Sequence, residues 1–269
     1  MVIITFKRPP MKRLISLSVV LVAVLLFTAN VQASLEVIGT ATYGGYDYNL
    51  IYESDSLEGG LVWLDYTKSL SSWLNQKNWA AGLGANLEVN LNPGYTTSID
   101  WSTGWRLPVT DESQANLTGP WTDLSIGDGT GRGWGGPNAS GYHDYKRGHN
   151  MVNSELGHLY YVSMGNQGSV STGGTNQFLE DGLKNTGGFL NLSEDIYWSD
   201  TVYFDTSQSD AWRFHFGRGD QDISAQGNGF YALAVRPGEV SAVPIPGALL
   251  LMASGLAGLL VSSGRRVPS

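Results

Sequence analysis

The chain has 269 residues, with 24 Asp and Glu against 16 Lys and Arg, and it contains no cysteine. The acidic balance argues against nucleic acid as a partner, because phosphate backbones repel an acidic surface. The absence of cysteine excludes disulfides, thiolate metal sites and cysteine catalysis.

The first 33 residues have the pattern of a secretory signal peptide. Lys12 and Arg13 precede an apolar run over residues 14–27, and a small-x-small sequence ends at Ala33, just before Ser34. We therefore expect translation to start at Met11 and a signal peptidase to cleave between Ala33 and Ser34. The alternative is a retained membrane anchor, although the apolar run is shorter than the ~20 residues that a spanning helix needs.

Residues 34–240 form the body of the chain, which is long enough for a single domain with its own core. It holds ten Lys and Arg and all 24 Asp and Glu, so its net charge is 10 − 24 = −14. Alternating apolar residues rich in Thr and Tyr predict a strand or hairpin over residues 39–52, and a second strand is predicted over 60–65.

The clearest helix signal covers residues 73–83. Ser71 or Ser72 is placed to act as its N-cap, and Gly82 or Gly84 lies near its end. Helical spacing puts four residues on the face that we expect to be buried: Trp73, Gln76, Ala80 and Leu83.

An ordered series of short motifs follows the body from end to end: GLVWLD at 60–65, GWRLP at 104–108, YWSDT at 197–201, AWRFHFGRGDQD at 211–222 and YALAVRPG at 231–238. In this order they resemble the Lcl C-terminal domain, long called DUF1566. The resemblance implies an α+β fold: a single C-type-lectin-like domain with mixed or antiparallel strands, two or three helices and long Gly-rich loops.

We expect the motif residues to be structural. Trp63, Trp105 and Trp198 stand in apolar, strand-like contexts, so their rings are predicted to be core. Arg106 and Arg236 are predicted to be half-buried and paired with a carboxylate or with backbone carbonyls, because a planar guanidinium offers five donors. The full set of predicted structural residues is Trp63, Trp105, Arg106, Leu107, Pro108, Trp198, Trp212 and Arg236.

A Gly-rich section over residues 119–150 alternates aromatic with polar side chains. Exposed aromatic rings beside Asp and Asn suit sugar recognition, and long loops on a rigid scaffold often carry binding sites. The alternative is a solvated insertion without a ligand. The candidate glycan-binding residues are Trp121, Trp134, Asn138, Tyr142, Asp144 and Tyr145.

Calcium is a possible ligand of this acidic body, and no other cofactor is predicted. Its candidate ligands are Asp123, Asp128 and Asp200, and the pair Asp220 and Asp222 is a further source of carboxylate oxygens. The spacing Asp-x-Asp-x-Asp-Gly is absent, and so are the Glu-Pro-Asn and Trp-Asn-Asp triplets of sugar-binding C-type lectins.

No catalytic residue is predicted. Glu155 and His158 would share one face of a helix, but a carboxylate-bridged metal site needs a second such pair. The His-Glu-x-x-His, Gly-x-Ser-x-Gly and P-loop patterns are missing. The Lcl-type family also looks related to the formylglycine-generating enzymes. Those enzymes depend on cysteine, so their chemistry is not expected in this cysteine-free chain.

Residues 241–269 have the pattern of a sorting signal. Val243, Pro244, Ile245 and Pro246 precede an apolar segment over residues 247–261, and a basic pair follows, Arg265 and Arg266. This order resembles the PEP-CTERM signals in their Val-Pro-x-Pro variant, which implies an exosortase as a processing partner and membrane contact through the apolar helix before processing.

Together these patterns predict an exported protein of the cell surface or matrix, acting as a non-catalytic binding or structural module for extracellular polysaccharide or adhesion. Two alternatives stay open. One is an extracellular glycan-processing enzyme, and the other is a permanently membrane-anchored envelope protein without a ligand.

Overall fold

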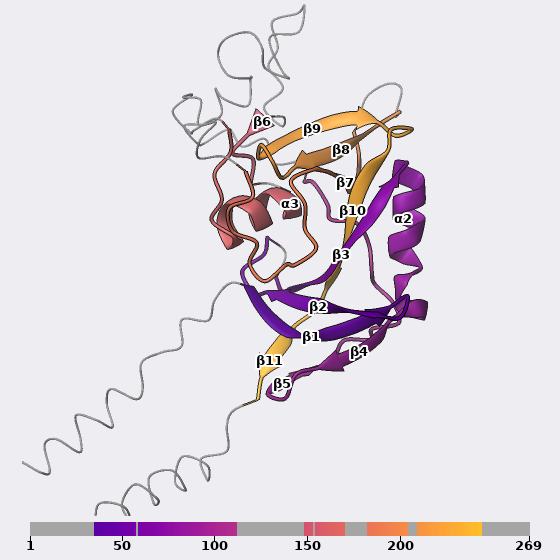
Figure 1. Ribbon diagram of the computed structural model, residues 1–269, viewed down its shortest axis with the longest axis vertical. Coiled ribbons are helices and arrows are strands. Elements are labelled where there is room, and N and C mark those ends of the chain that lie inside the picture. The colour runs from indigo at the N-terminus through magenta and orange to yellow at the C-terminus, as the bar shows by residue number, and fades with distance from the viewer. Residues whose placement is uncertain are drawn as a thin grey trace, which may run out of the picture. The chain divides into compact units, whose positions relative to one another are not determined.

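The computed structural model describes residues 35–57, 59–111, 148–152, 154–169, 182–203 and 209–243. All of them belong to one unit of the chain, Ser34–Ser269. Figure 1 shows these residues as a strongly twisted sheet with short helices beside it.

The described chain begins with a hairpin and a long third strand. Strands β1 (Leu35–Tyr43) and β2 (Tyr46–Glu53) pair antiparallel. Gly44 and Gly45 make the turn with φ of 60° and 85°, the left-handed geometry that two-residue hairpin loops require. The hairpin form of the prediction is thus confirmed, and the strand expected at 60–65 runs on as β3 (Leu61–Ser71).

Helix α2 (Trp73–Ala81) follows β3, and a 3-10 turn, η1 (Leu83–Asn86), continues it. Ser72 occupies the N-cap, but its side chain makes no capping hydrogen bond; its carbonyl accepts the amide of Gln76 at 3.0 Å. Side-chain capping by Ser72 is therefore not observed. The face predicted to be buried is confirmed, since Trp73, Gln76, Ala80 and Leu83 are all buried.

The remaining elements are short. They are β4 (Glu88–Leu91), β5 (Tyr95–Thr97), β6 (Gly148–His149), α3 (Glu155–His158) with its π-helical continuation η2 (Leu159–Ser163), β7 (Ile196–Val202), β8 (Asp210–His215), β9 (Asp220–Ala225), β10 (Phe230–Pro237) and β11 (Val240–Ala242). No helix in the described ranges has the length and apolar character that crossing a membrane requires.

Nine strands form one mixed sheet in the order β4-β1-β2-β3-β10-β7-β8-β9-β6, and β11 pairs with β5 in a separate two-stranded sheet. Every described pair is antiparallel except β10 with β7, which is parallel at Tyr231 and Tyr197. The described chain is therefore mostly strand, with an open mixed sheet and a few short helices.

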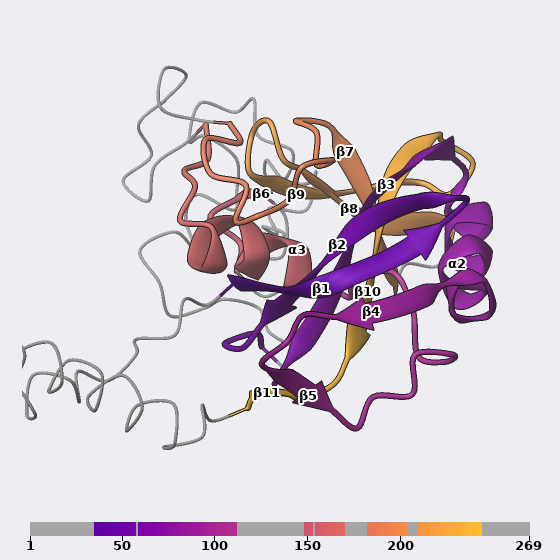
Figure 2. The same cartoon turned by 60° about the horizontal axis from the view of Figure 1, so that its bottom comes forward.

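Both faces of the sheet are buried. On β3, Val62 and Leu64 belong to the core that includes α2, whereas Leu61 and Trp63 belong to the core that includes α3. Figures 1 and 2 show the two helices on opposite sides of the sheet. This double burial explains why β3 and β10 read as continuous apolar runs and not as strict alternation.

Candidate functional site

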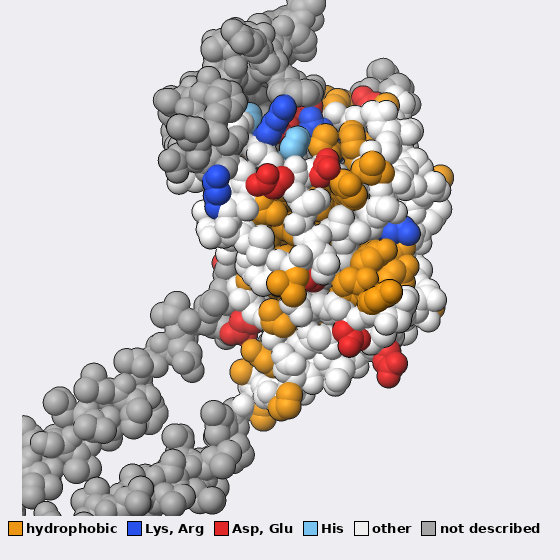
Figure 3. All heavy atoms as spheres, in the orientation of Figure 1, with side chains coloured by type: hydrophobic (Ala, Val, Ile, Leu, Met, Phe, Trp, Pro, Cys, Tyr) orange, Lys and Arg blue, Asp and Glu red, His pale blue; other side chains and the backbone are white. Residues whose placement is uncertain are grey.

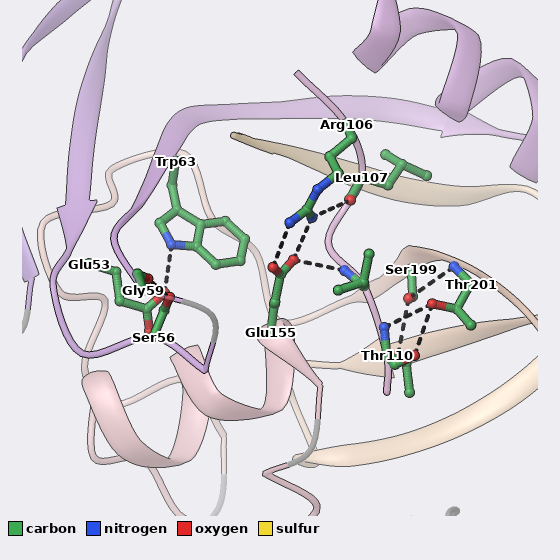
Figure 4. A network of polar contacts seen from close by, with 11 residues as sticks. Glu53, Ser56, Gly59, Trp63, Arg106, Leu107, Thr110, Glu155, Ser199 and Thr201 are labelled. Atoms are coloured by element: carbon green, nitrogen blue, oxygen red, sulfur yellow. Dashed lines mark hydrogen bonds and ion pairs between the residues drawn. The ribbon is translucent and has the colours of Figure 1, made fainter. Parts of the chain in front are cut away.

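Arg106 fastens the GWRLP segment to helix α3. Its guanidinium binds the Glu155 carboxylate through two hydrogen bonds, 2.6 and 2.7 Å long, and donates to the Leu107 carbonyl at 3.1 Å. One Glu155 oxygen also accepts the Val109 amide at 2.8 Å. Figure 4 shows this bidentate contact. The predicted pairing of Arg106 with a carboxylate is confirmed, and this bidentate contact has a structural role, because it joins the GWRLP segment to α3.

Arg236 holds the loop before Trp105 against β10. Its guanidinium donates to the carbonyls of Asp100 and Thr103, the latter at 2.8 Å. It also lies over the rings of Trp101 and Trp105, 5.4 and 6.0 Å from their centroids. Burial lowers the pKa of this guanidinium. The predicted pairing with backbone carbonyls is confirmed.

The YWSDT motif binds the segment that follows Arg106. Thr110 donates its amide to the Thr201 hydroxyl at 2.9 Å and its hydroxyl to Ser199 at 3.0 Å, and Thr201 donates back to the Thr110 carbonyl (Figure 4). Asp200, a calcium candidate, has a carboxylate oxygen 2.7 Å from the Lys77 ammonium. In this arrangement the Asp200 carboxylate is half of an ion pair.

The other motif residues lie in the core. Trp63, Trp198 and Trp212 are fully buried, and Trp105 is almost fully buried. Leu107 and Pro108 are also buried. Asp220 and Asp222, the further calcium candidates, flank the buried Arg213 at 2.8 and 3.0 Å.

Glu155 and His158 share helix α3 but serve different partners. The Glu155 carboxylate binds Arg106, whereas Nδ1 of His158 lies 3.1 Å from Oε1 of Glu53, a residue 105 positions earlier. The two residues therefore do not form a joint site.

His158 belongs instead to a compact polar cluster, which we define as Glu53, Asp55, His158 and Ser163. One ligand atom each from Glu53, Asp55 and His158 lies within 4.8 Å of the others. The Ser163 hydroxyl donates to Glu53 Oε1 and lies 3.5 Å from Asp55 Oδ1 and 3.3 Å from His158 Nδ1. Glu53 and His158 are buried and Asp55 is exposed, so the cluster opens to solvent on one side.

The two buried members of the polar cluster are held from behind. The Trp63 indole donates to Glu53 Oε2 at 2.8 Å, as Figure 4 shows, which leaves Oε1 facing His158. Ser154 caps α3 by accepting the Gly157 amide at 2.9 Å, and this fixes the turn that carries His158. Sequence reasoning missed Glu53, the last residue of β2, and Asp55 in the turn that follows it; the close spacing of the two carboxylates was the available signal.

The polar cluster does not have the geometry of a serine nucleophile with its base. Such a relay uses the two ring nitrogens of histidine separately, one toward the hydroxyl and the other toward the carboxylate. Here the Ser163 hydroxyl and the Glu53 carboxylate both contact Nδ1 of His158. Oxygen and nitrogen atoms that converge in this way suit a bound cation better than a covalent intermediate.

A second feature is an aromatic cluster on the α2 side of the sheet, which we define as Tyr43, Tyr48, Tyr66 and Trp79. Tyr66 lies 5.1, 4.9 and 5.9 Å from the ring centroids of Tyr43, Tyr48 and Trp79. The Trp79 indole donates to the Tyr43 hydroxyl at 3.2 Å. Burial, followed by the nearby phenols of Tyr43 and Tyr48, raises the pKa of Tyr66.

The aromatic cluster reaches the surface. All four rings are partly exposed where they pack on the core, and Tyr46, on the same face of β2, is 72% exposed. Figure 3 shows hydrophobic side chains gathered where β2, β3 and the end of α2 meet. Sequence reasoning expected aromatic binding residues elsewhere, although the alternating tyrosines of β2 were visible.

Several expected site residues lie outside the described ranges. They are the glycan candidates Trp121, Trp134, Asn138, Tyr142, Asp144 and Tyr145, the calcium candidates Asp123 and Asp128, and the processing residues Ala33, Ser34, Pro244, Ile245, Pro246, Arg265 and Arg266. Val243 is the last described residue; it is exposed, and its amide donates to the Gly94 carbonyl at 2.7 Å.

No family model, curated protein or solved structure matches this chain. Function is therefore inferred from the sequence patterns and from the geometry of the polar and aromatic clusters.

Proposed function

We propose that this protein is exported, sorted to the cell surface or matrix by an exosortase, and acts there as a non-catalytic module that binds extracellular polysaccharide. For its architecture we propose a C-type-lectin-like domain of the Lcl C-terminal type. The order of the sequence motifs supports that assignment, and a mixed sheet with few short helices is compatible with it.

The aromatic cluster is the observation that carries the binding proposal. Sugar rings present apolar CH faces that pack on aromatic rings, and their hydroxyls bond to polar atoms at the rim. Tyr43, Tyr48, Tyr66 and Trp79 offer four rings whose contacts with one another hold them in place. A platform ordered before binding loses little side-chain entropy when the ligand arrives.

Many charged side chains of the fold make internal structural contacts, which supports a non-catalytic role. Arg106, Arg213 and Arg236 each bind carboxylates or carbonyls inside the fold. These contacts are structural, and they draw Glu155, Asp220 and Asp222 into ion pairs. The signal peptide pattern that precedes the body supports an extracellular setting.

Retention on polysaccharide tests the proposal. The full-length protein, purified in a detergent without a sugar headgroup, is applied to extracellular polysaccharide from the producing bacterium, with calcium and then with chelator. We expect retention of the wild type, and a loss of about tenfold in affinity for Tyr48→Ala, which corresponds to about 1.4 kcal/mol.

Tyr231→Ala is the matched control, because Tyr231 is a partly exposed tyrosine that packs on the opposite core. Thermal unfolding of both variants checks that each of them folds. Equal retention of Tyr48→Ala and the wild type would contradict the role of the aromatic cluster, and no retention at all would contradict glycan binding. Shortening of the polymer during the assay would point to a processing enzyme.

A further inference from the structure

We propose that Glu53, Asp55 and His158 form a binding site for one divalent transition metal ion, Zn²⁺ or Mn²⁺, with the Ser163 hydroxyl beside it. The proposal does not depend on polysaccharide binding, because the polar cluster lies on the opposite core from the aromatic cluster: Trp63, which binds Glu53, belongs to the α3-side core.

Charge balance is the first argument. The buried Glu53 carboxylate lies 3.1 Å from Nδ1 of His158. Asp55 adds a second carboxylate at the same point, and no Lys or Arg in the described ranges forms an ion pair with Glu53 or Asp55. A divalent cation at this point would balance the charge of both carboxylates.

The donor set is the second argument. Calcium and magnesium are bound by oxygen atoms, while imidazole with carboxylates suits zinc and other transition metals. The three ligand atoms lie within 4.8 Å of one another, and a small rotation of the exposed Asp55 side chain would bring them onto a shared ion at bond lengths near 2.0–2.2 Å. The exposed side chain of Asp55 provides the entry path.

Orientation of the ligands is the third argument. Metal-binding carboxylates are held by hydrogen bonds from groups behind them. The Trp63 indole does this for Glu53, leaving Oε1 directed at the cluster centre. The Ser163 hydroxyl lies within 3.5 Å of a polar atom of each of the three residues, so it occupies the neighbourhood that the ion would share.

Metal titration of the full-length protein in detergent tests the site. After chelator treatment and dialysis, Zn²⁺, Mn²⁺ and Ca²⁺ are added separately in a calorimeter, and Co²⁺ serves as a visible-absorption probe of nitrogen and oxygen ligands. We expect one Zn²⁺ or Mn²⁺ per chain, binding at least tenfold tighter than Ca²⁺, with a rise in Tm on binding.

Asp55→Asn is the decisive variant, because its exposed side chain can be neutralised without disturbing the core. We expect it to weaken binding at least tenfold and to leave the Tm of the metal-free protein unchanged. Asp47→Asn is the matched control: Asp47 is an exposed carboxylate near the start of β2 that accepts a hydrogen bond from Thr42, and this variant is expected to bind like the wild type.

Glu53→Gln and His158→Gln should also lose the metal, but they change buried groups, so the conclusion does not rely on their folding. The proposal is overturned if the wild type shows no one-to-one binding. It is equally overturned if Asp55→Asn binds as tightly as Asp47→Asn, which would indicate diffuse attraction to the acidic surface, or if Ca²⁺ binds as tightly as Zn²⁺ and Mn²⁺.

Discussion

The two faces of strand β2 carry two different kinds of chemistry. Tyr48 projects to the α2 side with the aromatic cluster, while Glu53 joins the polar cluster on the α3 side. Because side chains alternate along a strand, one element supplies both candidate sites from interleaved positions. Its register therefore matters doubly, since a slip of one residue would place a carboxylate among the aromatic rings and a tyrosine beside His158.

The largest expected effect comes from removing the indole behind the polar cluster. Trp63→Ala deletes a fully buried ring, which costs about 3–5 kcal/mol, and it leaves Glu53 Oε2 without the hydrogen bond from Trp63, which costs roughly 1–3 kcal/mol more. Urea denaturation measures the free energy of unfolding of each variant. Trp198→Ala is the comparison on the α2 side, because the Trp198 indole donates to the neutral Ser71 carbonyl. A smaller loss for Trp63→Ala than for Trp198→Ala would contradict the added cost of leaving Glu53 without its hydrogen bond.

A smaller effect is expected where α3 meets the GWRLP segment. Arg106→Met removes a guanidinium that makes two hydrogen bonds to buried Glu155, and breaking such a pair from one side costs about 3 kcal/mol. Adding Glu155→Gln removes the stranded charge, so the double variant should recover part of the stability. A double-mutant cycle in urea measures the coupling. Strictly additive losses would show that the pair is not coupled.

The smallest expected effect is a pH dependence at the end of β8. Burial, the largest influence, lowers the pKa of His215 from its ordinary value of 6.5. Between the pKa of His215 in the folded chain and its value of 6.5 in the unfolded chain, the unfolded chain binds more protons at His215 than the folded chain does. The neutral, buried imidazole therefore contributes stability above pH 6.5, and this contribution is lost as the pH falls through the pKa of the folded chain. His215→Gln should flatten that part of the stability profile. An unchanged slope below pH 6.5 would contradict the assignment.

Local patterns predicted the local structure of this protein well. The helical spacing of Trp73, Gln76 and Ala80 identified a buried face, and the density of Thr and Tyr predicted a strand or hairpin, which is a hairpin in the structure. The chemistry of Arg106 predicted a carboxylate partner but not which one. Periodicity assigns residues to a face; it does not say what meets that face from a distant part of the chain.

The polar cluster shows where sequence reasoning fails. The spacing of Glu155 and His158 predicts that they share one helix face, yet Glu155 binds Arg106 and His158 contacts Glu53. The partner of His158 lies 105 residues away, and the packing of α3 against the face of the sheet that carries Ile51 and Trp63 brings the two together. Contacts that depend on topology leave no trace in a spacing rule.

The pairing of β3 with β10 also bears on how the body acquires its structure. Trp63 lies opposite Val235, so the centre of the sheet joins segments from near the two ends of the body. Pairings between such distant segments form slowly, because a long stretch of chain must first be closed into a loop. Along the proposed export route, β3 has no central neighbour until residues 230–237 have emerged. On that route the central sheet would be completed only after β10 has crossed the membrane.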